Sequence, residues 1–371
     1  MNRNFAATSQ QGWRTAHNVL AVRLDAMGDV LMTTPALRAL KRSHAAGRQV
    51  TLLTSPAGAA LARMVPEIDD LIVYEAPWMK SAKSCADPVP DRELIALLQE
   101  RQFDGAVIFT VYSQSALPAA LLCYLAGIPL RLAYCRENPY KLLTTWVVET
   151  EPQTEIRHEV QRQLDLAAHA GADAEPGRLS LRINDHASQR ARNFVAAQGL
   201  DRMRPWAIVH PGATAPSRRY SPKRYAQAAA ILARDYGWQI IFTGTVCEIP
   251  LVEFIRDEMR APSYSAAGAL NLETLCALIA LAPVIIVNNT GPAHIAAAVG
   301  TPVVGLYALT NLQHTPWLVA SRVLYHDVPC KNCYKSICPM GHHGCLAHVP
   351  PDSVVSAALE MAAIGRQRIN Q

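Results

Sequence analysis

Short apolar runs recur along the chain, and each is followed by a segment of helical length. The run VLAVRL at residues 19–24 has the length and branched-residue content of a buried strand, and apolar residues then recur at helical spacing over residues 30–43. Three further apolar runs, QVTLLT, LIVYEA and GAVIFTVY, alternate with helical segments in the same way. Apolar strands that alternate with helices predict a doubly wound α/β domain with a parallel sheet.

A second series of the same kind begins with PWAIVH at residue 205 and continues with WQIIFTG, APVIIVN and TPVVGLY. The intervening residues 151–204 are mainly helical in pattern. A length of 371 residues suits two domains at about 150 residues each. We therefore predict domains over residues 1–180 and 181–350, facing each other across a cleft, and a C-terminal helix over residues 351–371 that packs against a domain. Ligands of open parallel sheets bind beyond the carboxyl ends of the strands, which makes the strand-to-helix loops the candidate site.

Composition and charge narrow the class of protein. Half of the residues are hydrophobic and 18% are charged, as in an ordinary soluble globular protein. The net charge of +5 is modest, and the Lys and Arg residues are dispersed along the chain, so nucleic acid is not an expected partner. The same charge is compatible with binding to anionic membrane headgroups. Residues 1–18 lack the apolar run of a secretory signal, and the apolar stretch 116–132 is interrupted by Pro118 and Pro129. We expect no transmembrane segment.

The first strand-to-helix loop is DAMGDV, residues 25–30. Gly28 allows a close approach of the backbone, and Asp29 places a carboxylate at the start of a helix, where it would face the cleft. Two interpretations stand side by side: Asp25 or Asp29 caps the helix, or Asp29 acts on a substrate.

Two loops of the second half combine groups that suit a nucleotide. Residues 210–222, HPGATAPSRRYSP, gather hydroxyl, amide and guanidinium groups suited to a phosphate, although a solvated turn with two surface arginines would look the same. In the next loop, Gly244 lies between two threonines and Glu248 follows. Glu248 could bind ribose hydroxyls or supply charge to the start of a helix.

The motif NNTGPAH, residues 288–294, follows the strand VIIV and opens a helix. The amides of a helix N-terminus form a ready diphosphate site. The alternative is a helix capped by Asn289 or Thr290 with Pro292 in its first turn, and the two interpretations are compatible. His294 alone would more often be a packed core histidine.

Three segments in this order resemble glycosyltransferase family nine, the bacterial lipopolysaccharide heptosyltransferases: RLDAMGDVLMTTPALRALKR, HPGATAPSRRYSPKRYA, and NNTGPAHIAAAVGTPVVGLY followed by Pro-Trp. The resemblance covers nearly the whole chain. It implies a GT-B fold with two Rossmann-like domains, an N-terminal acceptor domain and a C-terminal nucleotide domain. It also implies an inverting transfer of heptose from ADP-heptose to a glycolipid acceptor at the inner leaflet, with no metal required for catalysis. The enzyme would be cytoplasmic or peripheral to the inner membrane.

The resemblance also assigns roles to residues. Asp29 matches the family's general base, which takes the acceptor proton. The family's diphosphate contacts are matched by Thr214, Thr290, Gly291 and His294. Glu248 matches a ribose ligand, and Leu270 matches a residue beside the nucleotide base. Gly28 and Gly244 belong to the same donor-binding set. Two positions depart from the family: Arg218 stands where relatives often carry Lys, and Asn289 where many have Asp. The acceptor is expected at loops 77–91 and 109–115.

A cysteine cluster lies outside these motifs. Four of the nine cysteines, Cys330, Cys333, Cys338 and Cys345, form a C-x2-C-x4-C-x6-C pattern with His342 and His343 inside it. These soft ligands suit a structural zinc or iron ion, while reduced thiols or local disulfides remain the alternatives.

Three other classes of function were weighed. A nucleotide-diphosphate-binding module without transferase activity would use the cysteine cluster for a partner or a metal. A nucleic-acid-binding ribbon would need more basic and aromatic residues around the cysteines than Lys331, Tyr334 and Lys335. A hydrolase would need a paired acid and base, which the loops do not display.

Overall fold

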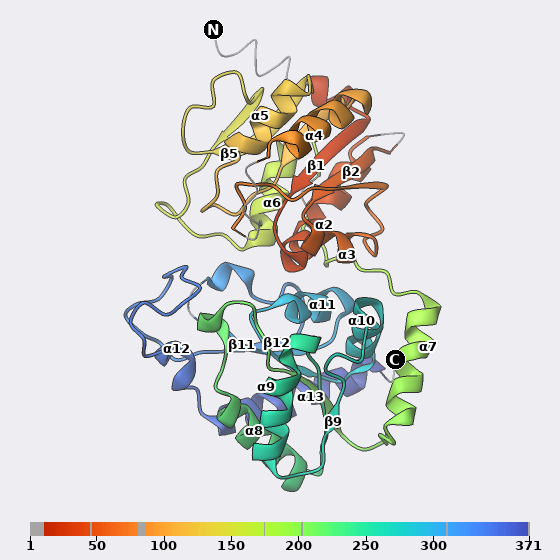
Figure 1. Ribbon diagram of the computed structural model, residues 1–371, viewed down its shortest axis with the longest axis vertical. Coiled ribbons are helices and arrows are strands. Elements are labelled where there is room, and N and C mark those ends of the chain that lie inside the picture. The colour runs from red at the N-terminus through yellow and green to blue at the C-terminus, as the bar shows by residue number, and fades with distance from the viewer. Residues whose placement is uncertain are drawn as a thin grey trace. The chain divides into compact units, whose positions relative to one another are not determined.

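The computed structural model describes residues 11–44, 47–80, 87–173, 175–201, 203–308 and 311–369. The chain separates into two compact units, Met1–Arg182 and Ile183–Gln371. Each unit is a six-stranded sheet flanked by helices (Figure 1). The predicted α/β class with two doubly wound sheets is confirmed, because every strand pair in both sheets is parallel.

The sheet of the first unit has the order β3-β2-β1-β4-β5-β6. Its strands are β1 (Asn18–Arg23), β2 (Gln49–Thr54), β3 (Asp70–Val73), β4 (Gly105–Ile108), β5 (Leu130–Cys135) and β6 (Thr145–Val148). Every residue of β1 after Asn18 is buried, as expected for a central strand covered on both faces. The strand order reverses between β1 and β4, so the loops that follow these two strands diverge and leave room for a ligand.

The helices of the first unit are α2 (Met27–Arg42), α3 (Pro56–Ala62), α4 (Val89–Glu100), α5 (Leu117–Leu125) and α6 (Glu159–Ala168). α2 packs against α3 and α6, and α4 packs against α5. The surface loop predicted over residues 77–91 is too long, because α4 already begins at Val89, with Pro90 in its first turn. The pattern analysis also missed β5 and β6.

The second unit repeats the same order, β12-β11-β10-β7-β8-β9. Its strands are β7 (Trp206–His210), β8 (Gln239–Phe242), β9 (Tyr264–Ser265), β10 (Ile285–Asn288), β11 (Val303–Leu306) and β12 (Ser321–Leu324). Its helices are α7 (Asp185–Ala197), α8 (Pro222–Arg234), α9 (Ile249–Met259), α10 (Leu272–Leu281), α11 (Gly291–Val299), α12 (Gly344–Ala347) and α13 (Pro351–Ile369), with single 3-10 turns η1 (Pro216–Arg218), η2 (Val246–Glu248) and η3 (Leu312–His314). Here the order reverses between β7 and β10.

The C-terminal helix α13 packs against α8, β11 and β12 of its own unit. Its Gly365 lies so close to the main chain that a Cβ there would be 1.8 Å from the carbonyl oxygen of Pro283. Arg368 near its end donates to the carbonyl oxygens of Ala280, Ala282 and Val299. These contacts tie the tail to the second unit.

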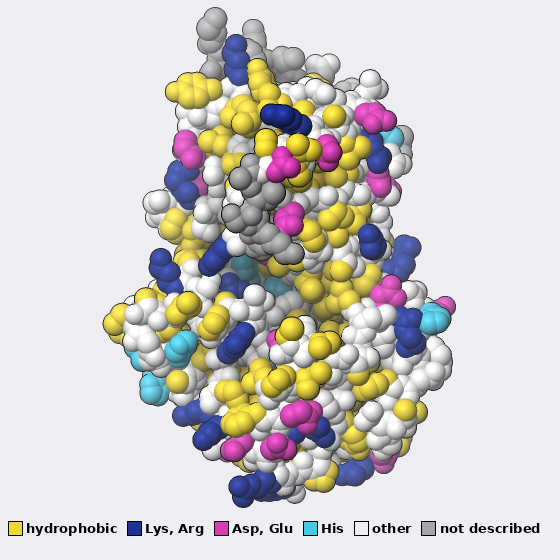
Figure 2. All heavy atoms as spheres, in the orientation of Figure 1, with side chains coloured by type: hydrophobic (Ala, Val, Ile, Leu, Met, Phe, Trp, Pro, Cys, Tyr) yellow, Lys and Arg dark blue, Asp and Glu magenta, His cyan; other side chains and the backbone are white. Residues whose placement is uncertain are grey.

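The surface carries charges of both signs. On the face shown in Figure 2, Lys and Arg side chains are dispersed among acidic and apolar ones rather than gathered in one patch. In the described part of the chain, no helix combines the length and the apolar character needed to cross a membrane.

Candidate functional site

One buried guanidinium organises the carboxylates that follow β1. Arg23, the last residue of β1, is fully buried. Its Nε lies 3.0 Å from Asp25 Oδ2, and its Nη2 lies 3.2 Å from Asp29 Oδ1 and 2.9 Å from Oε1 of Glu159 in α6. Three carboxylates therefore surround one cation. Sequence analysis singled out neither Arg23 nor Glu159, although an arginine inside an apolar strand was a signal.

Asp29 is both a helix-start residue and an accessible carboxylate. Its Oδ2 accepts a hydrogen bond from the Ala26 amide at 3.3 Å, at the N-terminus of α2. Its side chain keeps 19% of its surface exposed. Asp25 does not cap the helix, because its side chain binds Arg23 and Gln114, whose Nε2 donates to Oδ1 at 2.6 Å. Asp29 thus shows the capping contact that we considered and still reaches solvent.

Burial changes the acidity of Asp25. Desolvation raises the pKa of this carboxyl to about 6, while Arg23 and the hydrogen bond from Gln114 act in the opposite direction and the charge of Asp29 adds to the rise. The folded chain therefore holds this proton more tightly than the unfolded chain does.

This difference predicts a pH-dependent loss of stability. From pH about 4 to about 6 the unfolded chain releases the Asp25 proton and the folded chain retains it, so the free energy of unfolding should fall as pH rises, by roughly 3 kcal/mol from this group. Urea unfolding of wild type and Asp25→Asn at pH 4, 5, 6 and 7 measures it. Relative to the variant, wild type should lose stability across this window and then level off; a pH-independent difference would contradict the assignment.

A pocket of about 460 Å³ opens beside this cluster, within the size range of small-molecule sites. Asp25 lines it, together with Trp78 and Lys80 from one predicted acceptor loop and Phe109 and Gln114 from the other. The two loops therefore meet around one cavity at the carboxyl edge of β1 and β4. Residues 81–86 of the first loop lie outside the described residues.

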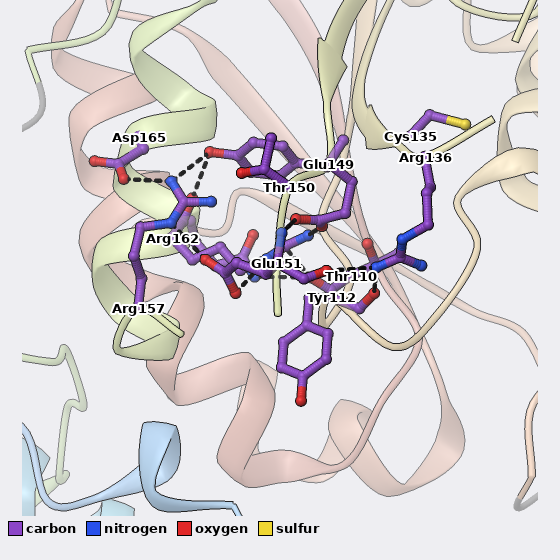
Figure 3. Close-up of polar contacts among 12 residues, drawn as sticks. Thr110, Tyr112, Cys135, Arg136, Glu149, Thr150, Glu151, Arg157, Arg162 and Asp165 are labelled. Atoms are coloured by element: carbon purple, nitrogen blue, oxygen red, sulfur yellow. Dashed lines mark hydrogen bonds and ion pairs between the residues drawn. The ribbon is translucent and has the colours of Figure 1, made fainter. Parts of the chain in front are cut away.

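A buried charged network holds the second of these loops (Figure 3). The Thr110 carbonyl oxygen accepts from Arg162 Nη1 at 2.6 Å and from Gln163 Nε2 at 3.0 Å, both residues of α6. Arg162 also pairs with Glu149, and its guanidinium carbon lies 4.3 Å from the centroid of the Tyr134 ring. Buried hydrogen bonds and ion pairs of this kind hold the loop in place.

The network continues from this loop to Asp29. Gln163 Nε2 also donates to Glu159 Oε1 at 2.6 Å, and Glu159 binds Arg23. A chain of contacts thus joins the pocket loop to the guanidinium that holds Asp29. These contacts join β1, the loop after β4 and α6, and no local sequence motif predicts them.

In the second unit, the loops after β7 and β8 meet at Glu248. A Cβ added to Gly212 would lie 1.8 Å from Glu248 Oε1, and one added to Gly244 would lie 3.2 Å from Glu248 Cβ. Glu248 Oε2 accepts from the Thr245 amide at 2.7 Å, so this carboxylate does support the start of a helical turn. Beside it, burial lowers the pKa of His210 and the charge of Glu248 opposes that shift.

Asn288 at the end of β10 joins the motif NNTGPAH to the loop after β7. It is fully buried, its Nδ2 donates to the Pro211 carbonyl oxygen at 2.7 Å, and its Oδ1 accepts from the Tyr220 amide and the Tyr225 hydroxyl. Sequence analysis quoted Asn288 but gave it no role. The structure makes it the link between the two loops at the reversal of strand order.

The start of α11 shows how far the capping interpretation holds. Thr290 holds the N-cap position, but its side chain makes no capping hydrogen bond, and Asn289 instead donates to Asn311 Oδ1 at 3.0 Å. The alternative interpretation thus holds in that Thr290 is the N-cap and Pro292 lies in the first turn, but neither side chain caps the helix by a hydrogen bond. The first-turn amides from Gly291 onward lack a side-chain cap in the described structure and suit an anion.

The remaining predicted donor residues lie around these loops. His294 is buried with 4% exposure. Leu270 is half-buried in a segment that the Gly268 amide ties to the Gly244 carbonyl oxygen at 2.9 Å. Thr214 is exposed.

The paired arginines in the loop after β7 differ in their surroundings. Arg218 is half-buried in η1, and its charge counteracts the rise in the pKa of the buried Tyr307 hydroxyl that burial causes. Arg219, expected as a surface arginine, is exposed but braces the loop, because its Nε donates to the Ala213 carbonyl oxygen at 2.7 Å.

The four clustered cysteines are half-buried free thiols, so they form no disulfide with one another in this structure. They line one small hollow together with His342 and His343. Within the described ranges, no three His, Cys, Asp or Glu side chains stand close enough together to hold a metal ion in their present orientations.

Two doubly wound parallel units, each with polar loops at the reversal of strand order, form the architecture of the GT-B fold class. The fold matches the glycosyl transferase family 9 structure from Veillonella parvula, with a TM-score of 0.76 and 20% identity over 94% of this chain and 97% of that one. It also matches E. coli ADP-heptose lps heptosyltransferase II, with a TM-score of 0.70 and 23% identity over 94% and 99%.

The model of glycosyltransferase family 9 (heptosyltransferase) matches residues 92–343, and the chain belongs to this family. Lipopolysaccharide heptosyltransferase 2 of Escherichia coli K12 is 26% identical over 91% of this chain and 96% of its own length. Lipooligosaccharide heptosyltransferase 2 of Haemophilus influenzae is 27% identical over 81% and 85%.

Proposed function

We propose that this glycosyltransferase moves a heptose from ADP-heptose to a hydroxyl of a lipopolysaccharide-core or related surface glycan, with inversion and without a catalytic metal. The observation that carries the proposal is Asp29, a solvent-accessible carboxylate held by Arg23. The same guanidinium binds Asp25, which lines a sugar-sized pocket. The two relatives described above align along most of this chain and are named as heptosyltransferases, which supports the choice of sugar.

Asp29 acts as the general base. As the acceptor hydroxyl attacks the anomeric carbon, its proton passes to the Asp29 carboxylate, and the bond between that carbon and the diphosphate oxygen breaks. A single displacement of this kind inverts the anomeric centre. Arg23 and the Ala26 amide hold one oxygen each of the carboxylate, so the group needs little reorientation to accept the proton.

The second unit holds the donor. The first-turn amides of α11, with Thr290, Gly291 and His294, stabilise the charge that develops on the leaving diphosphate, and Thr214 and Arg218 add a hydroxyl and a cation. Glu248, held over Gly212 and Gly244, binds the ribose hydroxyls. Leu270 flanks the adenine, and Asn289 and Gly28 complete the donor set.

The acceptor binds in the pocket of the first unit. Trp78 offers an apolar face to a sugar ring, and Lys80 offers a cation to an acidic group of the acceptor. A glycolipid acceptor of this kind would bring the enzyme to the cytoplasmic face of the inner membrane as a peripheral protein.

Calorimetric titration with ADP, ADP-heptose, UDP and a UDP-sugar, without added metal, tests the donor. We expect ADP and ADP-heptose to bind at least about tenfold more tightly than the uridine ligands, an affinity difference of about 1.4 kcal/mol. A preference for uridine would overturn the choice of donor. Tight binding of ADP without transfer to any core oligosaccharide would favour a nucleotide-binding module that lacks transferase activity.

A further inference from the structure

The cysteine loop, residues 330–345, follows β12 and runs into α12, and its four cysteines line one hollow. Cys330, Cys333, Cys338 and Cys345 line a hollow of about 20 Å³, room for about one water-sized sphere. All four are free thiols. Histidine side chains also gather on the surface over α12 (Figures 1 and 2).

One of these histidines contacts a cysteine sulfur. The Gly344 amide donates to His342 Nδ1 at 2.7 Å, so the ring of neutral His342 carries its proton on Nε2. This Nε2 lies 3.7 Å from Cys330 Sγ and can donate to it. His342 therefore lies beside a cysteine sulfur, in the place that outer-shell partners of metal ligands take.

The loop has little apolar packing of its own. Two of its large apolar side chains, Ile337 and Met340, are 70% and 64% exposed. Three residues other than glycine, Asn332, Tyr334 and His343, adopt left-handed backbone conformations with φ of 58°, 53° and 47°. Such conformations are unfavourable for L-residues and persist only where other contacts hold them in place. Small segments without a core are commonly held by a metal or by disulfides.

We propose that this loop binds one zinc-class ion, zinc or iron, through the thiolates of Cys330, Cys333, Cys338 and Cys345, with His342 donating to one of the sulfurs. Four thiolates in a tetrahedron are the preferred set for these metals. The thiols do not yet converge at ligating distance, so binding requires rotation of the cysteine side chains toward the hollow.

The ion would also stabilise the donor site, an extension that rests on the proposed function. Ser217, adjacent to Arg218, is buried and lines the same hollow. Its amide donates to the Ser336 carbonyl oxygen at 3.0 Å and its hydroxyl donates to the Lys335 carbonyl oxygen at 2.7 Å. These two hydrogen bonds attach the cysteine loop to η1, the turn that contains Arg218.

A second contact leads from the loop to the start of α11. The Tyr334 hydroxyl donates to Gln313 Oε1 at 2.7 Å, in η3. Asn311, two residues earlier, accepts from Asn289 at 3.0 Å. The loop therefore supports both segments that we assign to the diphosphate.

Metal content of the full-length protein tests the site. Protein purified without chelators and dialysed should retain about one zinc or iron per chain by elemental mass spectrometry, and the double variant Cys330→Ser/Cys333→Ser should retain less than a tenth of that. The matched control Cys247→Ser removes an exposed thiol outside the loop and should keep the metal. Equal metal content in the double variant and the control would overturn the proposal.

Wild-type protein provides a test that does not depend on whether the double variant folds. After removal of metal, titration with zinc should bind one equivalent and protect the four loop cysteines, but not Cys247, from alkylation. Failure to protect them, or disulfides among them in freshly purified protein, would overturn the site.

The link to the donor is measured separately. Removing the ion should weaken ADP binding about tenfold, and adding zinc back should restore it. Unchanged ADP affinity would overturn the link. If the metal-loaded protein binds no ADP at all, the proposed function is wrong. The measured metal content still tests whether the four cysteines bind a metal ion.

Discussion

Asp29→Asn should lower kcat at least about a hundredfold, because it removes the only proton acceptor of the proposed reaction while keeping the shape of the side chain. The Ala26 amide can still donate to the remaining carbonyl oxygen, so the start of α2 should keep its geometry. ADP binding should stay within about twofold of wild type, because the donor residues other than Gly28 lie in the second unit. A fall in kcat with little change in donor affinity is the signature of a group that acts in the chemical step.

Release of ADP in the presence of a core oligosaccharide acceptor measures turnover, and calorimetry measures donor binding. Asp70→Asn is a suitable control, since Asp70 is a half-exposed carboxylate of the same unit that pairs with Arg101 at the surface. It should leave kcat within about twofold. If Asp29→Asn retains more than a tenth of wild-type turnover, the base lies elsewhere, and Asp25 would be the next residue to test.

Arg23→Met should destabilise the first unit by about 3–5 kcal/mol, the range for removing one partner of a buried ion pair. The substitution leaves Asp25, Asp29 and Glu159 without their shared cation, and the Glu159 side chain is only 1% exposed. In contrast, Arg322→Met removes an ion pair to Glu360 in which both side chains are about half exposed, and it should cost no more than about 1 kcal/mol.

Denaturant unfolding measures the loss, and hydrogen exchange shows where it occurs. Amides of β1, α2 and α6 should exchange faster in Arg23→Met, whereas those of the second unit should not. Arg23→Met/Glu159→Gln, which also removes a buried charge, should regain part of the stability. A double variant no more stable than Arg23→Met would argue that lost packing, and not unpaired charge, explains the effect.

Local patterns predicted most of the framework. The apolar run at residues 19–24 became β1, and WAIVH became β7. These predictions worked because a strand buried on both faces must be apolar throughout, a requirement met within a few adjacent residues. β5 and β6 were missed because Arg131 interrupts one and the other is half-exposed. The alternation also placed the polar motifs on strand-to-helix loops, at the carboxyl edges of the sheets.

The sequence by itself determined the α/β class, the family resemblance and the loops that carry Asp29, Glu248 and Gly291. Only the tertiary structure decided which side chains act together. Arg23 meets Glu159 across 136 positions, and Ser217 meets Ser336 across 119. Such pairs depend on the order of strands and the path of each crossover, because residues distant in the chain become neighbours only after the sheet has assembled. The local spacing of residues predicts single helices and strands, but it does not predict contacts between distant residues.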